Sequence, residues 1–320
     1  MRVLVIGGSG FIGTRLVGAL REAGHEPTIL DLRPSASYPD VTTIGDVTDR
    51  KDVEAALEHV DVAVNLAAEH RDDVRPVSRY EAVNVGGART LVAAAEARGV
   101  DRLVFTSTVA VYGLGRPRPD ETAPTRPFNE YGRTKLAAED VLRAWAAADP
   151  RRSLTIVRPC VVFGEGNRGN VWTLATQVAS GRFRFVGDGA NSKSMAYVGN
   201  VAAYLTGAVE AGPGVHLVNY ADGPDLTTRE LVAVLSERLG VPVGARAIPL
   251  PLGVLAGHVF DAAARLTGRT FPVSAVRVRK FAAETTVDAG RVDRSGFVRP
   301  YSIVEGLERT LAAEFPGGVR

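Results

Sequence analysis

The chain has 320 residues, of which 45% are hydrophobic and 23% charged, and its formal net charge is +2. These values are typical of a globular protein, and so small a net charge argues against a nucleic-acid partner. The single cysteine, Cys160, excludes a disulfide framework and a cysteine-based zinc site, so we expect no metal. The first six residues already read as a strand, and no apolar run reaches the ~18 residues of a membrane span. We therefore expect a cytoplasmic protein without a secretory leader.

Short apolar runs alternate with helical patterns along the first half of the chain. Predicted strands lie at residues 3–6, 28–30, 62–66, 103–106 and 154–157, and predicted helices lie near 11–23, 50–58, 79–98 and 130–148. This alternation is typical of βα units, which build a parallel sheet that helices cover on both faces. The sequence thus predicts an α/β fold with a doubly wound parallel Rossmann sheet.

The second half of the chain has a different character. Beyond about residue 165 it contains turns rich in glycine and asparagine, at 164–170 and 187–189, and a helix at 198–209 is expected to return to the sheet. We therefore predict a smaller C-terminal substrate lobe over the carboxyl edge of the sheet. The expected division is interleaved, with residues 1–167 and about 191–221 in the cofactor domain and about 168–190 and 222–320 in the substrate-binding lobe.

Glycines at positions 7, 10 and 13 lie between the first predicted strand and the first predicted helix. Gly7 permits a tight turn, Gly10 lets a pyrophosphate approach backbone amides, and Gly13 lets helix and strand pack closely. Because the triad follows a strand and opens a helix, a dinucleotide site is favoured over a plain turn. The full set of predicted cofactor contacts is Gly7, Gly10, Phe11, Ile12, Gly13, Asp31, Asp46, Val47, Leu66, Ala67, Ala68, Tyr131, Lys135 and Pro159.

Asp31, at the end of the second predicted strand, bears on the choice between NAD and NADP. A carboxylate there accepts hydrogen bonds from the ribose hydroxyls and repels a 2′-phosphate, so NAD is favoured. Arg33 lies two residues further on and would favour the phosphate, which makes this a preference. The alternative for Asp31 is a solvated turn residue.

Tyr131 and Lys135 are four residues apart in a predicted helix and therefore share one face. The ammonium can lower the pKa of the phenol, which would let Tyr131 act as a general base. Thr108, after a predicted strand, would hydrogen-bond the same substrate oxygen, and Thr106 and Ser107 are rival hydroxyls. The predicted catalytic set is Thr108, Tyr131 and Lys135, while the alternative for Tyr131 is a packed surface aromatic.

The sequence resembles the extended short-chain dehydrogenase/reductase family, and within it the nucleotide-sugar epimerases. The resemblance is carried by the glycine loop and by segments 65–68, 84–85, 106–113, 131–135 and 158–159. It implies an NAD-dependent epimerase that works through a 4-keto sugar, with Thr108 as the family's catalytic hydroxyl. Related 4,6-dehydratases carry an Asp-Glu pair after this hydroxyl, whereas this chain has Val109 and Ala110. Epimerisation is therefore favoured over loss of water.

Segments 67–74, 164–170, 193–200 and 276–281 are similar to bacterial 4-epimerases of N-acetylglucosaminyl-diphospho-undecaprenol. This resemblance implies a diphospho-linked N-acetylhexosamine as substrate, with a UDP-sugar as the alternative. A plain reductase and a non-catalytic NAD-sensing scaffold are further alternatives. Val161 stands where many UDP-sugar enzymes have Asn, and Lys193 stands where they have a diphosphate-binding Arg. Expected substrate contacts are His70, Thr108, Asn170, Lys193, Arg277 and Arg279, and we expect a homodimer.

Residues 248–264 form an apolar stretch that contains no Lys or Arg and is flanked by Arg246, Arg265 and Arg269. A short apolar helix with basic flanks is suited to lie on an anionic membrane. The alternative is a core or dimer-interface helix. The first interpretation predicts peripheral contact with the inner face of the plasma membrane.

Overall fold

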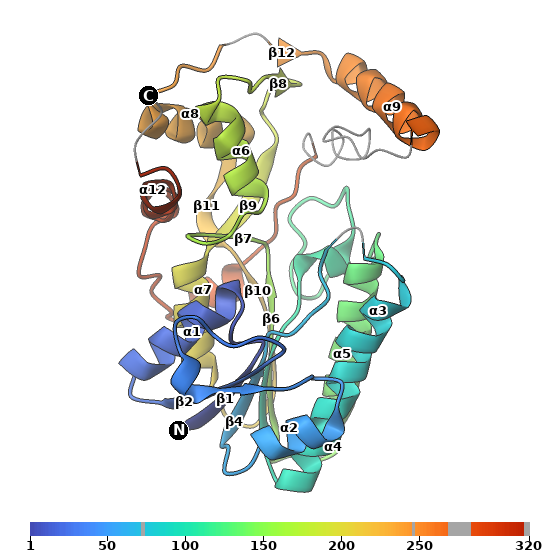
Figure 1. Cartoon of the computed structure of the whole chain (residues 1–320), viewed down its shortest axis with the longest axis vertical. Helices are drawn as coiled ribbons and strands as arrows, with labels where there is room; N and C mark the ends of the chain where they lie inside the picture. Colours follow the sequence, from blue (N-terminus) through green and yellow to red (C-terminus); the bar gives the residue numbers. More distant parts are fainter. Residues whose placement is uncertain (72–73, 245–246, 268–282, 317–320) are drawn as a thin grey trace.

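A parallel sheet in the order β10-β6-β5-β4-β1-β2-β3 lies at the centre of the computed structural model, which describes residues 1–71, 74–244, 247–267 and 283–316 (Figure 1). Its strands are β1 (Arg2–Ile6), β2 (Glu26–Asp31), β3 (Thr42–Ile44), β4 (Val62–Asn65), β5 (Arg102–Thr106), β6 (Ser153–Pro159) and β10 (Gly214–Tyr220). Every neighbouring pair is parallel. The chain order reverses between β1 and β4, so a crevice is expected at their carboxyl ends.

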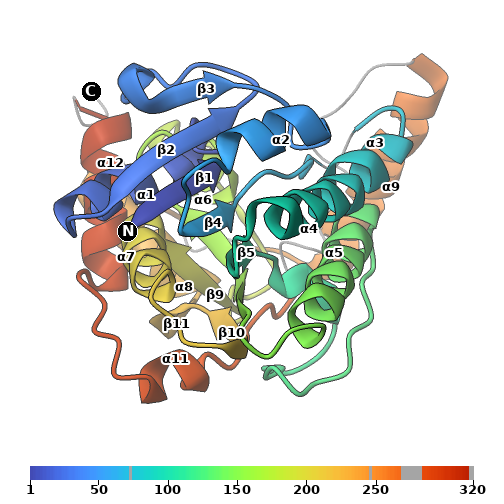
Figure 2. The same cartoon turned by 90° about the horizontal axis from the view of Figure 1, so that it is seen from below.

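The central strands are apolar because helices cover both faces of the sheet (Figure 2). On one face lie α1 (Phe11–Glu22) and α7 (Val198–Ala208), whose side chains pack on Val3 and Val5. On the other face lie α2 (Arg50–Ala56), α4 (Gly87–Arg98) and α5 (Glu130–Ala147), which pack on Leu4 and Ile6. The predicted doubly wound α/β fold is confirmed.

The lobe lies above the carboxyl ends of the strands (Figure 1). It contains a sheet in the order β11-β9-β7 and a short pair of strands, β8 and β12. The lobe elements are β7 (Val161–Phe163), α6 (Asn170–Ala179), β8 (Phe185–Val186), β9 (Ser192–Tyr197), β11 (Asp222–Thr227), α8 (Thr228–Leu239), β12 (Ala247–Ile248), α9 (Leu250–Thr267) and α12 (Ile303–Glu314). A separate hydrophobic core joins α6, α8, α12 and β9.

Shorter elements complete the described chain. They are η1 (Pro39–Val41), α3 (Ser78–Tyr80), the π-helical turn η2 (Glu81–Gly86), η3 (Val109–Tyr112) and α11 (Gly290–Arg294). The sequence does not predict strand β10, which pairs with β6 at the edge of the sheet after the chain has already built part of the lobe. Its first three residues are exposed, and this explains the weak apolar pattern. Among the residues described, none of the helices combines the length and apolarity that crossing a membrane would require.

Candidate active site

The glycine loop after β1 forms a cradle in which side chains larger than glycine would clash with the neighbouring backbone. Gly7 has φ +81°, and a Cβ there would lie 2.9 Å from the Ala67 backbone nitrogen after β4. A Cβ at Gly13 would lie 2.5 Å from the Gly7 carbonyl oxygen, so only glycine allows α1 to pack this closely. Gly10 precedes α1, and no side chain caps the first amides of this helix. These residues fit a dinucleotide, because free amides at a helix N-terminus bind pyrophosphate.

Asp31 lies at the carboxyl end of β2 and joins that strand to the glycine loop. Its carboxylate accepts hydrogen bonds from the backbone nitrogens of Ser9 at 3.0 Å and Arg33 at 3.1 Å. The Ser9 hydroxyl donates to the Arg33 carbonyl at 2.8 Å, which closes the turn. Asp31 is therefore held beside the glycine loop. Its carboxylate oxygens can accept further hydrogen bonds, which suits the hydroxyls of a ribose.

The remaining predicted cofactor contacts follow neighbouring strands of the sheet. They are Phe11 and Ile12 at the start of α1, Asp46 and Val47 after β3, Leu66, Ala67 and Ala68 after β4, and Pro159 at the end of β6. The Asp46 carboxylate accepts from the Thr48 nitrogen at 2.8 Å, and the Val47 side chain is buried. The carboxyl ends of these strands form one edge, so the structure brings these contacts together.

Thr108 is the hydroxyl that meets Tyr131. It precedes η3, where its Oγ1 accepts from the Ala110 nitrogen at 3.1 Å, and its hydroxyl hydrogen-bonds the Tyr131 phenol. The rival Ser107 donates instead to Glu139 at 2.5 Å. The Thr106 hydroxyl is buried and has no hydrogen-bond partner among the residues described. The structure therefore assigns different surroundings to the three hydroxyls that the sequence left open.

The side chains of Tyr131 and Lys135 lie in desolvating surroundings. Tyr131 is half-buried as a residue, but packing around its phenol raises the pKa to about 12, and the hydrogen bond from Thr108 opposes this. Burial lowers the pKa of Lys135 to about 7, while the charge of Glu139 acts in the opposite direction. The expected shift of the phenol pKa toward neutrality is thus not produced by these side chains, because desolvation outweighs the hydrogen bond from Thr108. A further cation is needed to stabilise the phenolate.

Asn84 anchors the N-terminal end of α5, and the sequence reasoning missed this role. The amide is buried in η2 and bonds both the nitrogen and the carbonyl oxygen of Glu69, at 2.8 and 3.1 Å. It also donates to the Thr134 hydroxyl at 2.9 Å. Asn129 caps α5 by accepting from the Gly132 nitrogen at 2.9 Å. Asn84 therefore fixes the loop after β4 against the helix that carries Tyr131.

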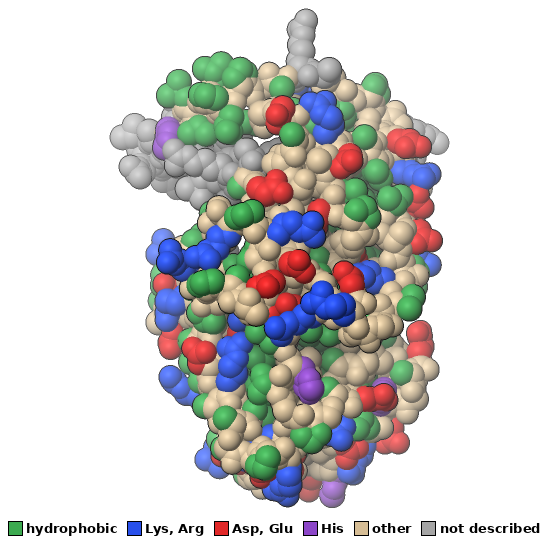
Figure 3. All heavy atoms as spheres, turned by 180° about the vertical axis from the view of Figure 1, so that it is seen from behind, with side chains coloured by type: hydrophobic (Ala, Val, Ile, Leu, Met, Phe, Trp, Pro, Cys, Tyr) green, Lys and Arg blue, Asp and Glu red, His purple; other side chains and the backbone are tan. Residues whose placement is uncertain are grey.

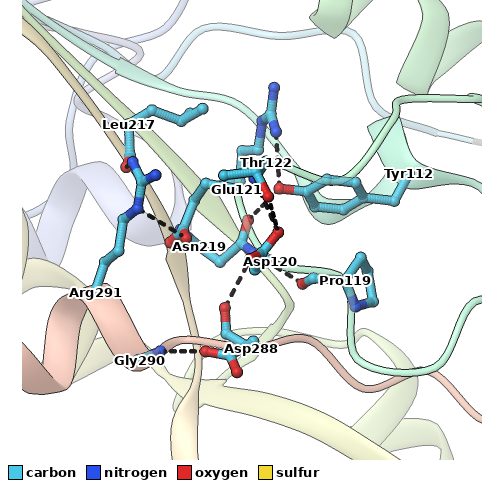
Figure 4. A network of polar contacts seen from close by, with 11 residues as sticks. Tyr112, Pro119, Asp120, Glu121, Thr122, Leu217, Asn219, Asp288, Gly290 and Arg291 are labelled. Atoms are coloured by element: carbon cyan, nitrogen blue, oxygen red, sulfur yellow. Dashed lines mark hydrogen bonds and ion pairs between the residues drawn. The ribbon is translucent and has the colours of Figure 1, made fainter.

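The loop between Thr108 and Tyr131 is attached to β10 through Asn219 (Figure 4). The Asn219 amide accepts from the Tyr112 hydroxyl at 2.7 Å and donates to the carbonyl oxygens of Pro119 and Asp288, both at 3.1 Å. The Glu121 carboxylate accepts from the Asn219 nitrogen at 2.7 Å. These contacts tie the loop between Thr108 and Tyr131 to the edge strand and to the segment before α11.

The predicted substrate contacts lie on several elements. His70 is exposed, and its Nδ1 lies 3.4 Å from the Ala68 carbonyl oxygen, which fits an anchor of its own loop. Asn170 is the exposed first residue of α6. Lys193, on β9, donates to the Ala283 carbonyl at 3.1 Å, and burial lowers its pKa while Glu284 opposes this. Arg277 and Arg279 lie outside the described residues.

A hollow of about 170 Å³ opens to solvent beside Tyr131. Its described lining consists of Val74, Arg75, Val77, Tyr80, Asn129, Glu130 and Tyr131. The hollow therefore lies between the loop after β4 and the start of α5, the two segments that Asn84 joins. Arg75 gives this wall a cation that the sequence reasoning did not consider.

The fold and the site are those of a dinucleotide-binding enzyme, and comparison with known sequences identifies the family. The model of the NAD dependent epimerase/dehydratase family matches residues 3–220, and the chain belongs to this family. It is 49% identical over 315 residues to the N-acetyl-alpha-D-glucosaminyl-diphospho-ditrans,octacis-undecaprenol 4-epimerase of Escherichia coli O157:H7, covering 98% of this chain and 95% of that protein. The predicted family and the predicted cofactor, NAD, are confirmed.

More distant relatives have other activities. The chain is 30% identical to the 2-alkyl-3-oxoalkanoate reductase of Stenotrophomonas maltophilia, covering 98% of this chain and 99% of that protein. Among solved structures, the NAD complex of the Thermus thermophilus UDP-glucose 4-epimerase matches with a TM-score of 0.77, at 25% identity and full coverage of both chains. The same scaffold therefore serves both epimerases and reductases.

Proposed function

We propose that this protein is an NAD-dependent 4-epimerase that interconverts N-acetylglucosamine and N-acetylgalactosamine on undecaprenyl diphosphate. The observation that carries the proposal is the 49% identity to an enzyme of that activity along nearly the whole chain. The hydrogen-bonded pair of Thr108 and Tyr131 supports it, with Lys135 one helical turn away. A sensor or scaffold would need no such base, which argues against the non-catalytic alternative.

In this proposal the chain's own residues handle the proton at the sugar's 4-hydroxyl. Tyr131 accepts that proton as phenolate and returns it when the 4-keto sugar is reduced on its other face. Thr108 hydrogen-bonds the same oxygen and holds it against the phenol. Lys135 contributes positive charge below its pKa of about 7 and would bind the nicotinamide ribose. Tyr131 is partly exposed and lies beside a hollow that opens to solvent, which is where a sugar would reach its phenol.

The glycine cradle, Asp31 and the ends of β4 and β6 would hold NAD. Bound there, NAD would supply a reversible hydride acceptor for the sugar carbon and, in its oxidised form, a positive charge near the phenolate. The absence of carboxylates at Val109 and Ala110 favours this reversible exchange over elimination of water. The protein groups thus orient the substrate and move the proton.

An exposed apolar face on α9 supports a lipid-linked substrate. Leu252 and Leu255 are 57% and 60% exposed, and Ile248, Leu250 and Phe260 are also exposed. Figure 3 shows hydrophobic side chains gathered at this corner of the molecule, at its upper left. Exposure contradicts the core alternative for Leu252 and Leu255. We infer that this face rests on the inner face of the plasma membrane, where a polyprenyl chain lies.

Other expectations about this region stay predictions. Arg246 and Arg269 lie outside the described residues, as do Arg277 and Arg279. The diphosphate is assigned to Lys193 and Asn170, because Lys193 can exchange its carbonyl partner for phosphate oxygens. The homodimer, the cytoplasmic location and the interleaved division into two domains also stay predictions.

Product analysis tests the proposal. The purified protein is incubated separately with N-acetylglucosaminyl-diphospho-undecaprenol and with UDP-N-acetylglucosamine, and the sugar released by mild acid is identified. We expect N-acetylgalactosamine from the lipid-linked substrate in preference to the nucleotide sugar. Turnover of the nucleotide sugar alone would reject the lipid carrier and support the alternative UDP-sugar 4-epimerase.

A further inference from the structure

Glu139 is a buried carboxylate one helical turn beyond Lys135. Tyr131, Lys135 and Glu139 recur every four residues along α5 and therefore share the face that packs on the sheet. Glu139 is 0% and Lys135 1% exposed. Acidic and basic side chains are rarely buried so completely unless they are paired, so the surroundings of Glu139 require an explanation.

Three other side chains bind the Glu139 carboxylate. Arg158 on β6 donates through Nε to Oε1 at 2.8 Å and through Nη2 to Oε2 at 2.6 Å, and this arginine is itself buried. Arg143 on α5 approaches Oε2 at 2.9 Å. The Ser107 hydroxyl donates to Oε1 at 2.5 Å. Glu139 thus connects α5 to β6 and to the residue that directly precedes Thr108.

The charged and titratable groups around Lys135 come from several elements. Helix α5 contributes Tyr131, Glu139 and Arg143, strand β6 contributes Arg158, and η3 contributes Tyr112. Two other nearby carboxylates have partners of their own: Glu81 of η2 pairs with Arg133, and Glu96 of α4 pairs with Arg152. The Phe105 ring of β5 lies under the ammonium, 4.1 Å from Nζ to its centroid, and carries no charge. Among these groups Glu139 is the acidic one that acts on Lys135, opposing its burial.

We propose that Glu139 is a positioning residue of the reaction, which favours the cationic form of Lys135 against its burial and, through Ser107, fixes the segment that carries Thr108. Arg158 holds the carboxylate in place for both tasks with a two-point contact. The kinetic consequence rests on the proposed function, in which Lys135 acts as a cation. The electrostatic consequence concerns the protein alone and is measured without substrate.

Lysine-selective NMR tests the electrostatic part directly. The chain has four lysines, Lys51, Lys135, Lys193 and Lys280, so ¹³C-labelled lysine gives few signals, and Lys135→Met identifies the relevant one. In the wild type Lys135 should titrate near neutrality. In Glu139→Gln it should titrate at lower pH, since the opposing negative charge is gone. An unchanged titration would overturn the proposal.

Two further variants control for effects on the ion pair and on folding. Tyr112→Phe removes a hydrogen bond to Arg158 without changing charge, so Lys135 should titrate as in the wild type. Glu139→Gln leaves Arg158 unpaired and buried, which endangers folding. Combining it with Arg158→Met removes both members of the ion pair, and the reference for this double variant is Arg158→Met alone. Lys135 should titrate at lower pH in the double variant than in Arg158→Met, and equal titrations would contradict the assigned role of Glu139.

The pH dependence of turnover tests the kinetic part. A lysine with a lower pKa loses its charge sooner as pH rises, so the alkaline limb of the profile should move to lower pH in Glu139→Gln. Each unit of displacement reduces turnover above that limb about tenfold. A purely structural role would instead lower turnover by the same factor at every pH. If the wild type epimerises neither substrate, the proposed function fails, while the lysine titration still decides the role of Glu139.

Discussion

The exposed apolar face of α9 gives a prediction that separates membrane contact from core packing. We expect the double variant Leu252→Gln, Leu255→Gln to bind anionic liposomes more weakly and to fold as well as the wild type. Glutamine is chosen because it nearly matches leucine in length and in helix propensity. Both side chains are more than half exposed, at 57% and 60%, so the fold gains little from them.

The size of the effect follows from this exposure. Complete burial of a leucine side chain contributes about 2 kcal/mol, so burying the exposed part in lipid contributes about 1.2 kcal/mol for each residue. Losing both corresponds to about 2.4 kcal/mol, or a roughly 60-fold weaker affinity for the membrane. Substitutions at such exposed positions change the free energy of unfolding by about 0.5 kcal/mol or less.

Sedimentation with liposomes of anionic lipid measures the affinity, and chemical denaturation measures the stability. Val215 and Val298 serve as the matched control, because they are 47% and 82% exposed and lie outside α9. Changing both to Gln should leave liposome binding unchanged. Unchanged binding in the leucine variant, or a loss of several kcal/mol of stability, would refute the membrane interpretation of α9.

Two further predictions concern the chemistry and the cofactor. Tyr131→Phe should lower turnover by ~10²–10⁴-fold while NAD binding persists, since the variant loses the base and keeps the cradle; near-normal turnover would reject Tyr131 as the base. Calorimetry on cofactor-stripped protein should show much tighter binding of NAD than of NADP, because the Asp31 carboxylate repels a 2′-phosphate. Equal affinities would show that Arg33 governs this pocket instead.

Features with a local pattern were predictable from the sequence. The central strands of the parallel sheet and the helices that cover it follow from apolar periodicity, although edge strand β10 does not, and the glycine loop follows from its position between a strand and a helix. The Tyr131 and Lys135 pair follows from helical spacing. Glu139 follows Lys135 at the same helical spacing, so its place on this face of the helix could be predicted from the sequence. Its pairing with Arg158 on β6 could not, because no local spacing connects the two residues.

Long-range contacts could not be predicted in this way. Asn219 bonds Tyr112, which lies 107 positions away in the chain, and Pro119, which lies 100 positions away. No local spacing connects these residues, and only the pairing of β10 with β6 brings them together. The raised pKa of Tyr131 could not be predicted either, because helical spacing shows that Lys135 is near but not that the phenol is desolvated.

The fate of the hydrogen on the sugar's C4 tests the central claim most directly. N-acetylglucosaminyl-diphospho-undecaprenol deuterated at C4 is converted by the purified protein, and the product sugar is examined by mass spectrometry and NMR. An epimerase that takes the hydride and returns it should give N-acetylgalactosamine that retains the deuterium at C4, without net formation of NADH. Deuterium found in free NADH, or no conversion of this substrate under conditions where NAD is bound, would contradict the assignment as a 4-epimerase.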